Sequence, residues 1–160
     1  MGIFLMPAKA QYYEQSAGIR LGGSYGLTYK KFFNELDAIE FLIGGRDNGI
    51  HLTTTYQFNN PLNLSRNETF FLYYGGGAHV GYEKYSTKIL IDSTPTENDF
   101  FYGDQSYFSM GVDAIIGLEY RLLTAPITIG LDIKPYLSYI GFRYTRIDFW
   151  DTSISVKYVF

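Results

Sequence analysis

The sequence predicts an all-β protein, an eight-stranded antiparallel up-and-down β-barrel, and three observations favour this fold. Every recognisable element alternates apolar and polar residues with a period of two, and no segment carries the apolar stripe of a helix. The clearest runs, 50–59, 110–122 and 127–138, are long, because strands of soluble proteins usually cover about five or six residues. Aromatic residues make up 19% of the chain, and aromatic side chains are enriched in strands.

Length and composition exclude several classes of function. The 160 residues fit a single domain that is large enough for its own core. The chain has no cysteine, which excludes disulfides and thiolate metal sites, and its net charge of -3 without a basic run argues against nucleic acid as a partner. No run approaches the roughly 18 apolar residues of a membrane-spanning helix, but alternating barrel strands leave no such hydropathy signal.

Residues 1–10, MGIFLMPAKA, have features of the second half of a secretory signal peptide. A short apolar run precedes Ala8-Lys9-Ala10, which has the small-x-small pattern of a cleavage site. The basic segment that opens such signals is missing, so an unstructured apolar N-terminus is the alternative. We expect 1–10 to be the remnant of a signal peptide and 11–160 to form one exported barrel domain.

Five further segments read as weaker strands: 16–23, 25–33, 38–46, 70–83 and 152–160. If 16–33 were one strand, the barrel would have seven strands with its two ends on opposite sides. A split at Gly22-Gly23-Ser24 gives eight strands and places both ends on one side. Pro135 interrupts the 127–138 strand, because proline cannot donate to the ladder, and requires a bulge or a place at the rim.

Turn lengths predict the orientation of the barrel. The segments 34–37 and 124–126 are short, whereas 84–107 is long and polar. Outer-membrane barrels have short periplasmic turns and longer extracellular loops. We therefore expect outer loops at 84–107 and 139–151, with both termini periplasmic.

The direction of the apolar face separates a membrane barrel from a soluble one. In a membrane barrel the apolar face points outward to lipid and the polar face fills the lumen. Aromatic residues at both strand ends favour this reading, because they resemble interfacial girdles: Phe32, Phe33, Phe58, Phe70, Phe71, Tyr120, Tyr158 and Phe160 at one end, and Tyr82, Tyr85, Tyr107, Phe108, Tyr139, Phe142, Phe149 and Trp150 at the other.

Ionisable residues in the middle of strands also favour the membrane barrel, because they would lie in its lumen. Solvent on one side of an open sheet would explain them equally well. The barrel interior of eight strands is just wide enough for side chains, and buried charges need partners. We expect these residues to form a paired lumen network: Arg20, Lys30, Glu40, Asp113, Glu119, Arg121, Asp132 and Lys134.

Four segments carry a resemblance to a known family: GIRLGGSYGLTYKKFF, YYGGGAHVGY, DAIIGLEYRLLTAPITIGLDIKP and the terminal SISVKYVF. They resemble small eight-stranded outer-membrane β-barrel proteins of Bacteroidetes-type bacteria and, more broadly, the OmpX and OmpA-membrane-domain class. The resemblance implies a bacterial outer-membrane location. It also implies that Tyr158 and Phe160, the aromatics of the last strand, are the signal read by the barrel-assembly machinery.

No catalytic, cofactor or metal site is legible. His51 and His79, the two histidines, both fall on the polar parity, where hydrogen bonding in the lumen is the expected role, and no carboxylate company for a metal is evident. A lipid-A-modifying enzyme would need serine and histidine facing lipid. The glycine clusters 22–26 and 75–77 precede no helix, which argues against a phosphate site, and they read as a turn and as space for lumen side chains.

We therefore expect a non-enzymatic, monomeric outer-membrane barrel without cofactors. Its partners would be outer-membrane lipid, the barrel-assembly machinery and an extracellular partner bound through loops 84–107 and 139–151. Two alternatives stay open: a soluble calycin-like barrel that binds an apolar ligand, and a lipid-A-modifying enzyme.

Overall fold

The computed structural model describes residues 14–46, 49–62, 70–90, 100–122, 124–140 and 144–160. The expected signal remnant, residues 1–10, lies outside this part of the chain. Within it, no helix is long and apolar enough to cross a membrane.

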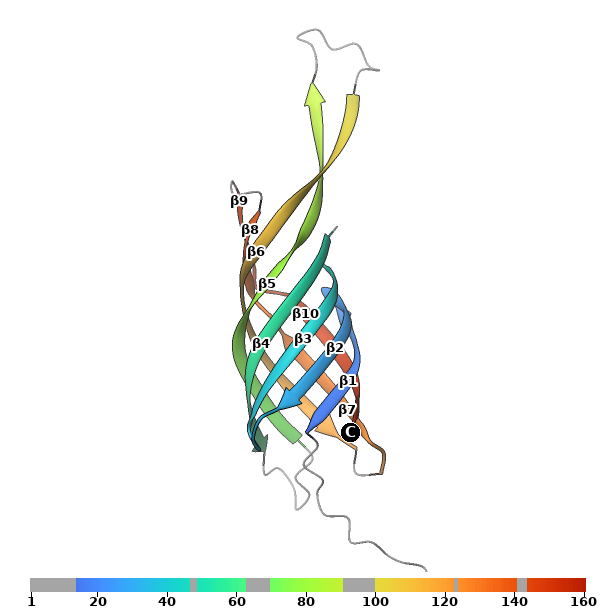
Figure 1. Ribbon diagram of the computed structural model, residues 1–160, viewed down its shortest axis with the longest axis vertical. Helices are drawn as coiled ribbons and strands as arrows, with labels where there is room; N and C mark the ends of the chain where they lie inside the picture. The colour runs from blue at the N-terminus through green and yellow to red at the C-terminus, as the bar shows by residue number, and fades with distance from the viewer. Residues whose placement is uncertain (1–13, 47–48, 63–69, 91–99, 123, 141–143) are drawn as a thin grey trace, which may run out of the picture.

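The described residues form one closed antiparallel barrel (Figure 1). From β1 to β6 each strand pairs with the next along the chain, β6 pairs with both β7 and β8, β10 pairs with β7, β9 pairs with β8, and β10 returns to β1. The strands are β1 Gln15–Gly22, β2 Ser24–Phe32, β3 Asp37–Arg46, β4 Gly49–Leu62, β5 Phe70–Leu90, β6 Phe100–Arg121, β7 Ile127–Ile133, β8 Tyr136–Ile140, β9 Tyr144–Asp148 and β10 Thr152–Val159. Since β7 with β8 and β9 with β10 each make up one interrupted wall strand, the barrel has eight strands, and the predicted fold is confirmed.

Closure of the barrel joins the two ends of the described chain. The backbone N–H of Gln15 donates to Phe160 O at 3.2 Å, and the N–H of Phe160 donates to Gln15 O at 2.9 Å. Both ends therefore lie on one side of the barrel, which we call the termini end (Figure 1). The opposite side, beyond which β5 and β6 continue, is called the hairpin end. That the termini end is periplasmic stays a prediction.

The turn at Gly22-Gly23-Ser24 divides the first segment into two strands, as predicted. β1 ends at Gly22 and β2 begins at Ser24, so Gly23 alone lies between them. The N–H of Gly23 donates to Thr152 O at 3.0 Å and ties this turn to β10.

Pro135 is accommodated by a β-bulge in the strand beside it. Along β6 the register stays continuous across the interruption, from Ile116↔Ile133 to Asp113↔Tyr136. On the other side, Ile133 pairs with Thr152 and Tyr136 pairs with Asp148, so residues 149–151 face only 134–135. One extra residue in one strand is the definition of a bulge, which re-aims side chains. The ladder thus continues past the proline without a change of register on the β6 side.

The bulge changes which residues of the last wall strand face the lumen. Phe149 and Trp150 are consecutive and both point outward, with exposed fractions of 64% and 79%. Asp151 then turns inward and is buried. If the alternation of β9 had continued without the bulge, Trp150 would have faced the lumen and Asp151 the outer wall.

The segment expected to be the outer loop 84–107 is mostly strand, and this expectation is wrong in its bounds. β5 and β6 remain paired from Lys84↔Ser106 to Leu90↔Phe100, beyond Glu83, where the pairing of β4 with β5 ends. The result is a two-stranded ribbon that projects from the hairpin end (Figure 1). Among the described residues this ribbon pairs with no third strand, and its sequence lacks the regular apolar alternation that marks a wall strand.

The expected loop 139–151 is also largely strand. β8 extends to Ile140 and β9 covers Tyr144–Asp148, with the bulge at 149–151 leading into β10. The cause of the error is the same as for 84–107, because β9 alternates only weakly between polar and apolar residues.

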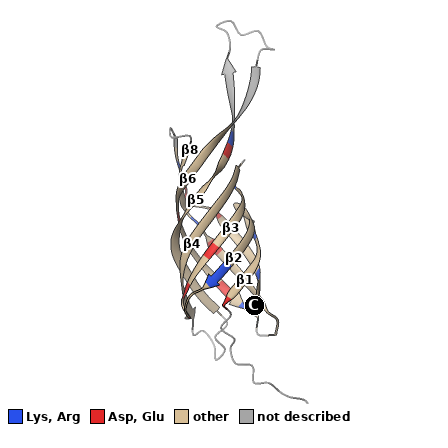
Figure 2. Ribbon diagram, viewed as in Figure 1, with Lys and Arg blue, Asp and Glu red and all other residues tan. Residues whose placement is uncertain are grey.

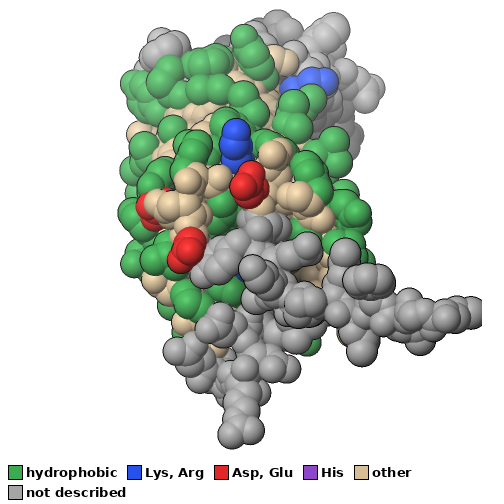
Figure 3. All heavy atoms as spheres, turned by 60° about the horizontal axis from the view of Figure 1, so that its bottom comes forward, with side chains coloured by type: hydrophobic (Ala, Val, Ile, Leu, Met, Phe, Trp, Pro, Cys, Tyr) green, Lys and Arg blue, Asp and Glu red, His purple; other side chains and the backbone are tan. Residues whose placement is uncertain are grey.

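The distribution of side chains is inverted relative to a soluble protein. Apolar residues cover the outer wall, with exposed fractions such as 63% for Leu27 and 56% for Leu131. Figure 3 shows hydrophobic side chains over the barrel side and few charged ones. Charged positions instead lie along the barrel strands (Figure 2) with their side chains buried in the interior. This is the arrangement of a membrane barrel, in which apolar side chains face lipid.

Two of the expected girdle aromatics point into the barrel instead. Phe32 and Phe71 are 9% and 6% exposed, so they cap the lumen near the termini end rather than meeting lipid. The outward aromatics at that end include Phe70 and Tyr120, whose ring centroids lie 4.8 Å apart. A position near a strand end does not tell whether an aromatic side chain faces lipid or the lumen. Its place in the alternation of the strand does. The side chains of Tyr85 and Phe142 lie outside the described part of the chain.

Candidate functional site

Charged side chains fill the lumen near the termini end. Lys157 Nζ lies 2.7 Å from Glu40 Oε1, and Lys30 Nζ lies 3.4 Å from Glu119 Oε2. Lys30 also donates to Asn59 Oδ1 at 2.6 Å. Removing charges from water is expensive, so short contacts to several acceptors are needed to offset that loss.

Glu40 is the most heavily bonded carboxylate of this group. Besides the ion pair with Lys157, it accepts hydrogen bonds from Thr28 Oγ1 and from Gln57 Nε2, the latter at 2.5 Å. These partners come from β2, β4 and β10, so one carboxylate on β3 links four wall strands across the interior.

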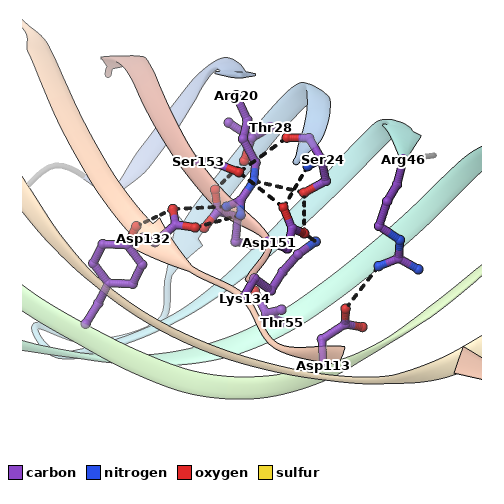
Figure 4. A network of polar contacts seen from close by, with 12 residues as sticks. Arg20, Ser24, Thr28, Arg46, Thr55, Asp113, Asp132, Lys134, Asp151 and Ser153 are labelled. Atoms are coloured by element: carbon purple, nitrogen blue, oxygen red, sulfur yellow. Dashed lines mark hydrogen bonds and ion pairs between the residues drawn. The ribbon is translucent and has the colours of Figure 1, made fainter. Parts of the chain in front are cut away.

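The middle of the lumen holds a second group, drawn in Figure 4. Arg20 Nη2 lies 2.6 Å from Asp132 Oδ1, and Tyr73 donates its hydroxyl to Asp132 Oδ2 at 2.7 Å. Asp151 accepts from the backbone N–H and the hydroxyl of Ser24 at 2.7 and 2.8 Å. The bulge therefore supplies a carboxylate that anchors the start of β2.

The hairpin end of the lumen is built around Arg46. Its guanidinium lies 3.6 Å from Asp113 Oδ1 and stacks 3.6 Å from the ring centroid of Tyr136. The same guanidinium donates to Ser138 Oγ at 3.3 Å. A planar guanidinium suits such combined stacking and hydrogen bonding.

Both histidines are buried and hydrogen-bonded in the lumen, as expected, and each has a carboxylate partner that the sequence did not reveal. His51 Nε2 lies 3.1 Å from Glu83 Oε1, and His79 Nδ1 lies 2.7 Å from Asp113 Oδ2. The two rings meet edge to face with centroids 5.7 Å apart. The described residues nevertheless contain no group of three or more His, Cys, Asp or Glu side chains placed to hold a metal ion.

Ser138, His79 and Asp113 are connected in the order of a serine-hydrolase triad. Asp113 contacts Nδ1 of His79, and Nε2 contacts Ser138 Oγ at 2.7 Å. A nucleophile must also meet its substrate. Ser138 is fully buried, and its oxygen already contacts Arg46. In this geometry the serine is a member of a packed hydrogen-bond network.

All eight charged residues expected in the lumen point into it, but only some are partners of one another. Arg20 meets Asp132, while Lys30 and Arg121 meet Glu119, the latter at 3.8 Å. Three others find partners that the sequence interpretation missed: Glu40 with Lys157, Asp113 with Arg46 and Lys134 with Asp151. The polar parity of β10 could have indicated both Lys157 and Asp151, which lies two residues before Ser153 on the same parity, and that of β3 could have indicated Arg46.

Glycines on the lumen parity make room for large side chains, as expected of glycines in a narrow barrel. A Cβ at Gly117 would lie 2.6 Å from Cζ of Tyr73, and a Cβ at Gly111 would lie 2.6 Å from Cε1 of His79. The 75–77 cluster was singled out in the sequence for this role. A Cβ at Gly75 or Gly77 would instead meet the backbone oxygen of Tyr56 or Thr54, so it is the glycines of β6 that make room for large lumen side chains.

The aromatics of the last strand lie on the outer wall at the termini end. Tyr158 and Phe160 are 57% and 59% exposed, and their rings stack with centroids 6.3 Å apart. They are therefore accessible along the outer surface of a strand that also closes the barrel.

Comparison with known proteins identifies no family. No family model matches the chain. No curated protein matches it either. Among solved structures, the chain is similar to the crystal structure of Ail, the attachment invasion locus protein of Yersinia pestis, with 14% sequence identity, a TM-score of 0.39, and coverage of 91% of this chain and 90% of that chain. A likeness this distant carries no argument about function, which must be inferred from the geometry of the chain itself.

Proposed function

We propose that the protein is a non-enzymatic outer-membrane β-barrel that anchors the β5–β6 ribbon at the bacterial surface. The observation that carries this proposal is the inverted distribution of side chains, with Leu27 and Leu131 on the outer wall and Lys30 and Glu119 buried in the lumen. Such a wall is stable only against lipid, and a closed barrel leaves no unpaired edge in the bilayer.

The inverted wall argues against a soluble barrel that binds an apolar ligand. A calycin-like barrel needs apolar side chains around its interior, and here ionised groups and their partners occupy that space. Apolar side chains exposed over the whole wall would also drive association in water.

The position of the histidines argues against a lipid-A-modifying enzyme. Such chemistry on a lipid substrate needs a histidine and a nucleophile at the lipid face. His51 and His79, the two histidines of the chain, are buried in the lumen with exposed fractions of 4% and 2%.

The projecting ribbon supports a role in surface interaction. Beyond Glu83 the β5 strand pairs only with β6 among the described residues, so one edge carries unpaired backbone N–H and C=O groups. Exposed strand edges bind extended segments of other chains by β-augmentation. We infer that the barrel is a monomer and that the unpaired edge of its ribbon binds a protein partner outside the cell.

Cell fractionation tests the location. The protein should sediment with outer membranes and migrate faster on gels before heating than after it, because a closed barrel resists detergent unfolding. Recovery of the folded protein from aqueous buffer without detergent would refute the proposal.

Protease treatment of intact cells tests the orientation of the ribbon. Trypsin should cleave after Lys84 or Lys88, leaving the remainder of the barrel protected. Cleavage that occurs only after the outer membrane is opened would place the ribbon in the periplasm. A variant in which a short turn replaces residues 85–105 serves as the control, and it should fold and resist trypsin.

A further inference from the structure

A small cavity lies in the lumen between the groups at the middle and at the termini end. It offers about 10 Å³ to the centre of a water molecule, which is room for roughly one water. Its polar lining consists of Arg20, Lys134, Glu40, Thr53 and Thr55, with two apolar side chains on the remaining wall. Figure 4 shows Arg20, Lys134 and Thr55 close together in this part of the lumen.

Two buried cations at this cavity have N–H groups that no acceptor among the described residues takes up. Lys134 Nζ lies 3.7 Å from Asp151 Oδ2, which is an ion pair but too long for a hydrogen bond. Arg20 Nη2 lies 2.6 Å from Asp132 Oδ1, a contact that can use only one of its two N–H groups. Lys134 and Arg20 are 1% and 3% exposed, so bulk solvent does not satisfy them. A buried unpaired donor costs about 1–3 kcal/mol, and more when it is charged.

We propose that this cavity is a binding site for one structural water molecule held between Lys134 and Arg20. Water has two lone pairs, which accept from these two donors, and two O–H groups. The two O–H groups of the water donate to the Glu40 carboxylate and to the threonine hydroxyls that line the cavity. The lining thus supplies both the donors and the acceptors that one water molecule can use.

The charges around the cavity favour a neutral ligand over a small anion such as chloride. Each charged lining residue already faces an opposite charge: Arg20 faces Asp132, Lys134 faces Asp151, and Glu40 faces Lys157. An added anion would lie against the Glu40 carboxylate without a counter-charge of its own, which is costly in a desolvated lumen.

The water adds a second link between two parts of the charge network, which already meet where Lys30 Nζ lies 4.8 Å from the ring centroid of Tyr73. Lys134 belongs with the Asp151 group, which holds the β1–β2 turn, whereas Glu40 belongs with the Lys157 group near the termini end. A bridge between them couples the two halves of the lumen.

Crystallography of the detergent-solubilised full chain, grown with bromide in place of chloride, tests the site. We expect a water peak within hydrogen-bond distance of Lys134 Nζ and Arg20 Nη2, and no anomalous signal there. An anomalous bromide peak would overturn the proposal in favour of an anion site. A cavity without electron density would overturn it as well.

A pair of threonine variants gives a second readout. Thr53→Val removes a hydroxyl that lines the cavity, so it should lower the midpoint of thermal unfolding. Thr128→Val is the matched control, because Thr128 is buried in the lumen away from the cavity and its hydroxyl has no partner among the described residues. The control should unfold at or above the wild-type midpoint. Equal midpoints for the two variants would overturn the proposal.

Discussion

Lys157 and Glu40 meet across the lumen, with Nζ 2.7 Å from Oε1, although their strands are not neighbours in the wall. β10 and β3 are separated by β1 and β2, so this ion pair fixes the width of the barrel from inside. Both side chains are almost completely buried.

We expect Lys157→Met to destabilise the barrel by about 3–5 kcal/mol, because it leaves the Glu40 carboxylate buried without its counter-charge. Urea unfolding in lipid vesicles measures this change. Lys31→Met is the control, since Lys31 is an exposed lysine, and it should change stability by less than about 0.5 kcal/mol. The double variant with Glu40→Gln should be more stable than the sum of the single effects predicts. Additive effects would show that the pair is not coupled.

A charge on the outer wall should be costly in proportion to its depth in the bilayer. Leu118→Arg places a charge on the outward parity of β6, where the cost at the midplane is about 2–4 kcal/mol. Leu36→Arg lies in the exposed turn between β2 and β3, where about 0–1 kcal/mol is expected. Refolding into vesicles measures both. Equal costs would mean that the two positions meet the same solvent.

The terminal aromatic should be needed for assembly in cells more than for stability. Replacing Phe160 with Ser should lower the amount of heat-modifiable protein in the outer membrane while refolding in detergent survives. Phe33→Ser is the matched control, because Phe33 is an aromatic of similar exposure, 60% against 59%, outside the last strand. If both variants assemble equally well, Phe160 is not an assembly signal.

The filled lumen should not conduct ions. The interior carries the side chains of paired charges, and Tyr73 and His79 occupy the space that Gly117 and Gly111 leave open. We expect no steady conductance in planar bilayers. Reproducible single-channel steps that change on Asp113→Ala would contradict this expectation.

Alternation was sufficient to predict the wall of the barrel, because the side-chain period of a strand determines the face. Ile129 and Thr128 fall on opposite faces for this reason alone, and Gly22-Gly23-Ser24 supplied the turn that sets the number of strands.

The partners inside the lumen could not be read in the same way. Whether Glu40 meets Lys157 depends on the stagger of all eight wall strands, which no local pattern encodes. The bulge opposite Pro135 reverses the parity between β9 and β10, so the faces of β9 could not be extrapolated from the alternation of β10. The projecting ribbon could not be predicted as strand, because residues 84–107 carry no regular apolar period.

Fluorescence of Trp150, the single tryptophan of the chain, tests most directly whether the outer wall faces lipid. Its side chain, within the bulge at 149–151, is 79% exposed on the outer wall. In vesicles whose acyl chains carry bromine near the head-group end, we expect strong quenching of its emission, together with weak quenching by aqueous acrylamide. Strong quenching by acrylamide without any effect of the brominated lipid would place the wall in water and contradict the membrane barrel.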